Sequence, residues 1–180
     1  MKNFKFSRLF AAALVVACLA LTGCKPATQV VTVEKVFVVR PVAADDAIVG
    51  SWVSTYKEKY DISTSGYNNY YTVYNEETQT YASDFTLSYT TVTPYIYDLG
   101  NNSGIIYSKF NDANKIGYGA TVGQWYALYY FGLSSNSVKV VQAYKNGGKA
   151  GCDSLEAAVK EFTVENGYFP TASASVCTKQ

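Results

Sequence analysis

Histidine is absent from the 180-residue sequence, and its absence excludes several kinds of site. Without an imidazole there is no Ser-His-Asp or Cys-His catalysis, no histidine metal ligand and no histidine pH switch. The charges are also nearly balanced, with 15 Lys and Arg against 14 Asp and Glu and a formal net charge of +1. A nucleic-acid partner requires a clustered basic field, so we expect no binding of nucleic acid.

Long hydrophobic runs are missing after the N-terminus. The one long apolar run, Leu9 to Leu21, follows a positive segment that carries Lys2, Lys5 and Arg8. It falls short of the ~20 residues needed to span a bilayer and is typical of a secretory signal. We therefore expect an exported protein.

The end of this run resembles the lipobox of bacterial lipoproteins, in the residues Leu21-Thr22-Gly23-Cys24. The resemblance implies a signal peptide over 1–23, cleavage before Cys24, and acylation of Cys24 by chains such as palmitate. Two or three acyl chains anchor a protein durably, so a membrane is an expected partner. In Gram-negative lipoproteins, an aspartate directly after the acylated cysteine usually causes retention in the inner membrane. This sequence has Lys25 at that position, so the resemblance implies an outer-membrane or surface location.

Four cysteines occur, at positions 18, 24, 152 and 177. With Cys18 in the signal and Cys24 acylated, Cys152 and Cys177 remain in a compartment that permits disulfides. A bridge between them would contribute roughly 3 kcal/mol in the chain-entropy model. The alternative is a redox or nucleophilic cysteine, but the sequence has no CxxC motif and no histidine base. We predict a structural Cys152–Cys177 disulfide.

Tyrosine is abundant, with 17 residues, and short alternating segments follow one another from Ile48 onward. We expect a lipidated N-terminus and linker over 24–47 and a β-domain over 48–180. Turn residues separate the segments, as in a meander or barrel. The eight strands that the pattern predicts cover residues 48–53, 56–62, 67–74, 81–89, 93–99, 105–110, 124–131 and 138–144.

The period changes to 3.6 near the C-terminus, which predicts one helix near 153–166. Leu155, Ala158, Val159 and Phe162 form one apolar stripe. Asp153 and Glu156 have the spacing of a capping box, Glu156 and Lys160 form an i,i+4 pair, and Asn166-Gly167 stops the helix. A final short segment leads to Cys177.

Gly50-Ser51-Trp52 at the start of these strands resembles the opening motif of the lipocalin-like branch of the calycin superfamily. In that family the Gly-x-Trp tryptophan packs across the closed end of the barrel, which implies this role for Trp52, with Gly50 as its partner. The family's arginine on the last strand has no counterpart here, since arginine occurs only at positions 8 and 40. The C-terminal stretch 155–169 also looks like small putative lipoproteins of spirochaete type. The fold expected is mainly β, an antiparallel lipocalin-like barrel of about eight strands with one C-terminal helix.

The acidic residues give little support for catalysis or metal binding. Paired carboxylates among Glu58, Asp61, Asp84 and Asp98 would suit glycoside hydrolysis, but no motif marks a pair. Oxygen ligands at Asp45-Asp46 and Asn111-Asp112 lack the spacing of a known Ca²⁺ loop. We expect no enzyme activity and no cofactor.

The tyrosines are the candidates for recognition, because each offers a large contact area and a polar tip. They also stabilise sheets as cross-strand pairs. Tyr126 and Tyr130 share one strand face, and Tyr129 takes the other. The candidate recognition residues are Tyr67, Tyr71, Tyr89, Tyr126 and Tyr130.

Two hypotheses about function follow. In the first, the barrel holds a small apolar or amphipathic ligand. In the second, a filled barrel acts as an adhesin or structural envelope protein, whose tyrosine-rich outer face binds host matrix, a glycan or another envelope protein. A cavity distinguishes them, because the first hypothesis fails if inward residues fill the interior. The residues expected to point inward are Trp52, Phe85, Leu87, Trp125 and Leu128.

Overall fold

The computed structural model describes residues 38–112 and 121–180. The predicted signal peptide, the lipobox with Cys24 and most of the predicted linker lie outside the described residues. All described residues belong to one compact unit, which begins at Val36.

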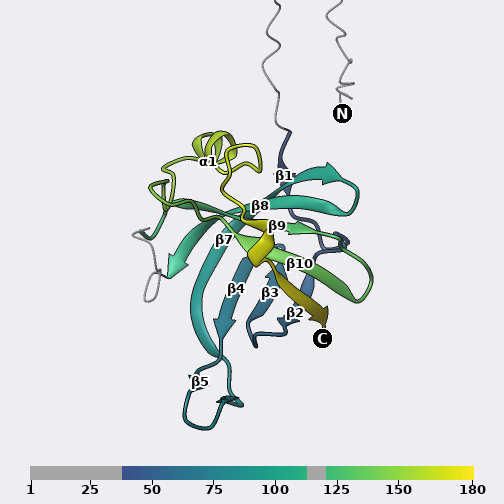
Figure 1. Ribbon diagram of the computed structural model, residues 1–180. Coiled ribbons are helices and arrows are strands. Elements are labelled where there is room, and N and C mark those ends of the chain that lie inside the picture. Colours follow the sequence, from purple (N-terminus) through teal and green to yellow (C-terminus); the bar gives the residue numbers. More distant parts are fainter. Residues whose placement is uncertain (1–37, 113–120) are drawn as a thin grey trace, which may run out of the picture. The chain divides into compact units, whose positions relative to one another are not determined.

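Eight antiparallel strands of the described chain close into a barrel (Figure 1). Each strand pairs with the next in chain order, and the last pairs with the first through Cys177 opposite Ser54. This confirms the predicted fold class, a mainly β meander barrel with one short C-terminal helix. The barrel strands are β2 (Gly50–Ser54), β3 (Lys59–Ser63), β4 (Gly66–Tyr71), β7 (Thr86–Gly100), β8 (Ser103–Asp112), β9 (Trp125–Phe131), β10 (Ser137–Gln142) and β11 (Ser175–Lys179).

The eight strands are not the eight that the alternation predicts. The segments expected at 81–89 and 93–99 contribute to one strand, β7, because the break near Thr93 is a bulge rather than a turn. Thr93 has a φ of 57°, and the pairing register with β8 shifts between Val92 and Tyr95. The eighth strand is β11, which follows the helix and closes the barrel.

Three short strands lie outside the barrel. β1 (Arg40–Pro41) adds to the edge of β7, with Arg40 opposite Ile96. β5 (Tyr74–Asn75) and β6 (Thr80–Tyr81) form a hairpin between β4 and β7. The side-chain oxygen of Asn75 accepts hydrogen bonds from the backbone N–H groups of Glu77 and Thr78, which stabilises the tip of this hairpin.

The predicted helix is present as α1 (Leu155–Glu161), which packs on β8 and β9. Its N-cap is Ser154, whose hydroxyl accepts from the backbone N–H of Ala157 at 3.1 Å, so the predicted capping box at Asp153 is wrong. The Glu156–Lys160 ion pair forms at 2.7 Å. The Asn166 amide donates to the carbonyls of Lys160 and Glu161, which ends the helix before the short 3₁₀ turn η2 (Thr171–Ser173). In the described residues, no helix has the length and apolar character required to cross a membrane.

The predicted disulfide is not formed, since Cys152 and Cys177 are both buried free thiols. Cys177 lies on the inner face of β11, opposite Val138 and Ser54. Cys152 forms an isolated bridge with Trp125, whose side chain alternates with the inward Tyr126 and therefore lies on the outer face of β9. The wall of the barrel separates the two sulfurs, which sequence spacing alone could not reveal.

Candidate functional site

One half of the barrel interior is filled by apolar side chains, and we call it the sealed half. Seven of the eight barrel strands contribute one residue each to it, Ile48 before β2 adds another, and all of these side chains are almost fully buried. They are Ile48, Trp52, Ile62, Ile96, Ile106, Leu128, Val138 and Cys177.

Trp52 is the largest side chain of this half. Its indole N–H donates to the carbonyl of Ile48 at 2.8 Å, and its side chain is fully buried. The ammonium of Lys179 on β11 lies 5.1 Å from the centre of the Trp52 rings, within cation–π range. Gly50 has a φ of 142°, a backbone conformation that favours glycine, whereas the nearest atom to a Cβ at this position is Cε of the flexible Lys179 side chain, at 3.0 Å.

In this chain the cation over Trp52 is a lysine, Lys179, and not an arginine. Residue patterns did not predict this contact, because the strand that carries Lys179, β11, was expected only as a short final segment. Its pairing with β2 places Lys179 opposite Trp52.

The other half of the interior is hollow, and we call it the open half. It contains a cavity of about 660 Å³ that is open to solvent. This volume is within the range of about 300–1,000 Å³ that is usual for small-molecule sites. The strand residues that line it are Tyr60, Asn69, Tyr71, Ser88, Tyr89, Phe110, Tyr126, Val140, Val141, Gln142 and Ser175. Glu58 and the 143–150 and 170–173 segments complete the rim.

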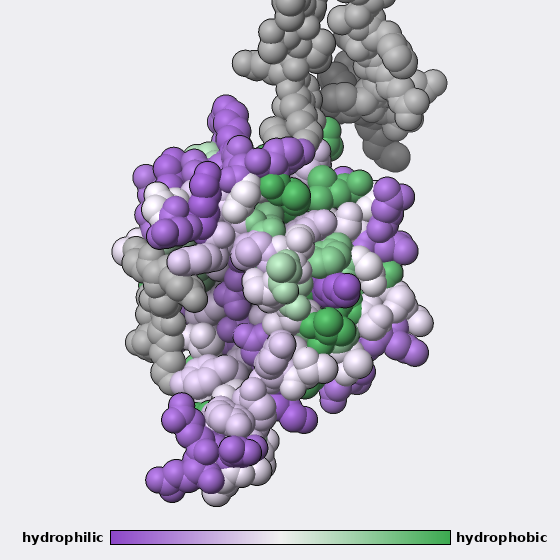
Figure 2. Space-filling view, viewed as in Figure 1, coloured by the Kyte–Doolittle hydropathy of each residue, from purple (hydrophilic) through white to green (hydrophobic). Residues whose placement is uncertain are grey.

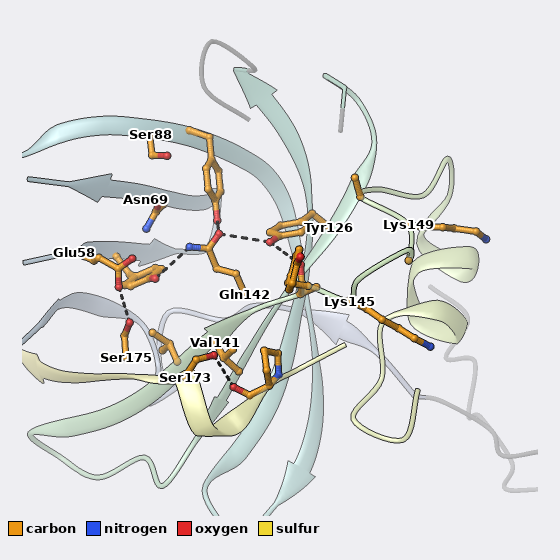
Figure 3. A pocket seen from close by; sticks show the side chains of 18 of the residues that line it. Glu58, Asn69, Ser88, Tyr126, Val141, Gln142, Lys145, Lys149, Ser173 and Ser175 are labelled. Carbon is orange, nitrogen blue, oxygen red and sulfur yellow. Dashed lines mark hydrogen bonds between the residues drawn. The ribbon is translucent and has the colours of Figure 1, made fainter. Parts of the chain in front are cut away.

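The side-chain amide of Gln142, at the end of β10, lies at the centre of this cavity (Figure 3). Its Nε2 donates to the hydroxyl of Tyr60 at 3.3 Å, and its Oε1 accepts from the hydroxyl of Tyr89 at 2.8 Å. The Tyr126 hydroxyl lies 3.5 Å from the same Oε1 and donates to the carbonyl of Ala143 at 3.0 Å. One amide thus orients two tyrosines from two different strands, Tyr60 and Tyr89, and a third, Tyr126, lies next to it.

Burial keeps these phenols neutral. Desolvation raises the pKa of Tyr60, of Tyr67 and of Tyr89 above the ordinary value for tyrosine. They therefore retain their hydroxyl protons, and so their capacity to donate, throughout the physiological pH range.

The structure places the five candidate tyrosines at different heights in the barrel. Tyr71, Tyr89 and Tyr126 line the cavity. The Tyr67 ring packs edge-on against Tyr89 with a centroid distance of 5.9 Å, so it supports the cavity wall. Tyr130 does not reach the cavity, since a Cβ on Gly104 would lie 2.6 Å from its hydroxyl, near the β7–β8 turn.

Several residues expected to point inward do not. Trp52 and Leu128 are inside, whereas Phe85 and Leu87 are exposed and Trp125 is on the outer face. The β4–β7 register shifts so that Tyr70 is opposite Leu87 while Asn69 is opposite Tyr89. This bulge moves Leu87 outward and Tyr89 inward, although simple alternation would place both on one face.

Glu58 and Asn69, together with Gln142, supply the polar groups of the inner wall. Glu58 Oε2 accepts a hydrogen bond from the hydroxyl of Ser175 at 2.5 Å. The Nδ2 of Asn69 is buried and has no hydrogen-bond partner among the described residues. Sequence reasoning listed Glu58 only as one of four acids and missed Asn69, Gln142 and Ser175. Only the closure of the barrel brings them together.

Two of the remaining acidic candidates form ion pairs away from the cavity. Asp61 binds Ser51 and pairs with Lys59 at 2.9 Å on the outer face. Asp46 pairs with Arg40 at 2.5 Å, and this contact lowers the pKa of the Asp46 carboxyl. In the described chain, no three residues of the His, Cys, Asp and Glu types cluster as a metal site would require.

Comparison of the whole chain with known protein families, with curated proteins and with solved structures finds no match.

Proposed function

We propose that the protein is a lipid-anchored binding protein of the cell envelope that holds a small amphipathic ligand in the open half of its barrel. The observation that carries the proposal is the 660 Å³ cavity. A barrel filled along its whole length would have left the first hypothesis without a site.

The lining favours an amphipathic ligand over a purely apolar one. Aromatic rings of Tyr89, Phe110 and Tyr126 pack together on one side, with Phe110 and Tyr126 stacked at a centroid distance of 4.8 Å. The amides of Gln142 and Asn69 and the carboxylate of Glu58 lie on the same cavity. A ligand with both an apolar body and polar groups would satisfy both kinds of surface.

The proposed anchor is an acyl group on Cys24, on the evidence of the lipobox sequence alone. Growth with a palmitate analogue that carries a clickable tag should label the wild-type chain. Cys24→Ser should abolish the label and release the protein from the membrane fraction. Equal labelling of both chains would contradict the anchor without touching the proposal of a ligand site.

The binding proposal is tested by native mass spectrometry of protein purified gently from the producing envelope. We expect a stoichiometric non-covalent adduct of low molecular mass. Ser88→Phe should remove the adduct, because Ser88 lines the cavity and a phenyl ring would fill it. Ser83→Phe, the same change at an exposed site, is the matched control. A bare chain mass for wild type would contradict the proposal.

The β5–β6 hairpin favours a second candidate function, binding of a glycan or protein at the surface. Tyr74 and Tyr81 pack at a centroid distance of 4.8 Å and both are exposed. Figure 2 shows this hairpin as a largely hydrophilic projection, so the two rings are offered to solvent among polar residues. Tyr74→Ser with Tyr81→Ser should abolish retention on a glycan array if this surface binds, and leave the cavity adduct unchanged.

A further inference from the structure

The cavity carries one carboxylate that forms no ion pair with the described part of the chain. Glu58 is the one carboxylate among its described lining residues. Oε2 of Glu58 accepts from Ser175, and no described cation forms an ion pair with Glu58. An anionic group beside a partly desolvated wall attracts a cationic partner.

The lysines at the rim are directed to other partners. Lys149 pairs with Glu161 on α1 at 3.1 Å, and Lys145 donates to the carbonyl of Asn166 at 3.0 Å while lying over the Tyr168 ring. In Figure 3 both lysines extend away from Gln142, on the side opposite Glu58 and Asn69. Their charges therefore do not compensate Glu58, and they do not form an anion site inside the cavity.

The walls beside Glu58 are aromatic. Tyr60, Tyr71, Tyr89 and Tyr126 line the same cavity, and the faces of such rings attract organic cations. Tyr71 is half-buried, so an apolar body attached to the cation would pack on its ring and remove its surface from water, while the almost fully buried Tyr60, Tyr89 and Tyr126 shape the wall behind it.

Asn69 supplies a third feature that a ligand should match, in addition to the carboxylate of Glu58 and the aromatic rings. Its buried Nδ2 has no acceptor among the described residues, although Asn69 lines the cavity. Asn69 is opposite Tyr60 on the β3–β4 ladder, and Glu58 precedes Tyr60 by two residues. Diagonal neighbours of this kind lie about 7–8 Å apart, so one small molecule can reach both.

We propose that the ligand is a small organic amine, with its ammonium group on Glu58, an aromatic or cyclic body among the tyrosines, and an acceptor oxygen on Asn69. This inference rests on the proposed function and assigns the ligand class of the same cavity. It is narrower than the proposed function, because a fatty acid or another anion could fill the cavity but would not be attracted by the carboxylate of Glu58.

The test compares four probes by calorimetry with the lipid-anchored protein in nanodiscs of neutral phospholipid. Tyramine carries a ring, an amine and a hydroxyl. 4-Ethylphenol lacks the amine, 3-(4-hydroxyphenyl)propionate replaces it by a carboxylate, and phenethylamine lacks the hydroxyl. At pH 7 we expect tyramine to bind about tenfold or more tightly than 4-ethylphenol, and the propionate to bind most weakly.

Two variants assign the contacts. Glu58→Gln keeps an acceptor for Ser175 but removes the charge, and should cost tyramine about tenfold in affinity while leaving 4-ethylphenol unchanged. Glu76→Gln, the same change at the exposed hairpin tip, should change neither. Asn69→Leu should abolish the advantage of tyramine over phenethylamine.

The outcomes separate this inference from the proposed function. Tighter binding of the propionate, or tyramine affinity that is unchanged in Glu58→Gln, overturns the amine and leaves the cavity as a site for another class. If no probe binds and the purified chain has its bare mass, both the amine and the proposed function are overturned.

Discussion

The two halves of the barrel are built from the same strands, yet one is packed and the other is hollow. Along β10 the inward residues pass from Val138 through Val140 to Gln142, and along β11 from Cys177 to Ser175. Each step of two residues keeps the side chain on the inner face but moves it from the sealed half to the open half. The residues that stabilise the barrel therefore lie toward one end of the strands, and the residues that line the candidate site lie toward the other.

The largest expected effect is on the reactivity of the Cys177 thiol, which should differ strongly between the native and the unfolded protein. This reactivity reports whether the sealed half excludes water. Burial raises the pKa of Cys177 to about 12. We therefore expect alkylation of Cys177 by iodoacetamide at pH 8 to be at least a thousandfold slower in the native protein than after unfolding, since the thiolate is the nucleophile. Mass spectrometry of native and guanidine-treated samples measures this ratio.

The same spectra decide the cysteine pairing. Unfolding without reductant should expose two reactive thiols, at Cys152 and Cys177. A chain that is two hydrogens lighter, with neither thiol reactive, would contradict the free thiols and support the predicted Cys152–Cys177 disulfide.

Truncation of Trp52 should cost the most stability. Trp52→Ala removes a fully buried indole and is expected to lower the free energy of unfolding by about 3–5 kcal/mol. Tyr71→Ala, at the half-buried cavity wall, is the comparison, and should cost less stability but weaken ligand binding. Denaturant unfolding checks both, and equal losses would contradict the division into two halves.

Replacement of the central amide should cost an intermediate amount. Gln142→Leu removes the amide that donates to the hydroxyl of Tyr60, while the hydroxyl of Tyr89 still lies 3.4 Å from that of Tyr67, and the loss of one buried partner costs about 1–3 kcal/mol. Gln142→Glu keeps acceptor oxygens for Tyr89 and should retain more stability. If Gln142→Leu were as stable as wild type, the amide would not organise the cavity.

Removal of the charge over Trp52 should have a smaller effect. Lys179→Gln is expected to cost about 0.5–1 kcal/mol, the range of an exposed cation–π contact. Lys179→Arg should retain the stability of wild type, since a guanidinium also stacks on indole. Thermal unfolding measures the series, and a loss in the arginine variant equal to that in the glutamine variant would assign the effect to packing instead.

The Arg40–Asp46 pair at the end of β1 should contribute least. Arg40 lowers the pKa of Asp46, so the folded state binds this proton more weakly than the unfolded chain does. The contribution is therefore fully present above about pH 4 and is lost as pH falls through the lowered pKa. Asp46→Asn should cost up to about 1 kcal/mol at pH 7, and this cost should shrink as the pH falls through the lowered pKa of Asp46. A constant difference across this range would contradict an electrostatic origin.

Much of the fold follows from the order of the residues. The two-residue alternation and the turn residues predict most barrel strands, and the 3.6-residue period predicts α1. Local patterns succeed here because strand and helix periods are properties of the chain itself. The Gly50-Ser51-Trp52 motif likewise marks the first barrel strand.

The candidate site was less accessible to prediction. Tyr89 and Tyr126 were expected from their chemistry, but Asn69, Gln142 and Ser175 are ordinary polar residues in sequence. The bulge opposite Tyr70 reverses the faces of Leu87 and Tyr89, and no local pattern announces it.

Residue order alone predicts the alternating strands and one helix near the C-terminus, and it shows the abundance of tyrosine. Only the tertiary structure decided which residues share a height in the barrel. Closure by β11 places Lys179 over Trp52, Ser175 beside Glu58 and the two cysteines on opposite sides of the wall. The reason is physical: strand period fixes the face of a side chain, whereas register between strands distant in sequence fixes its neighbours.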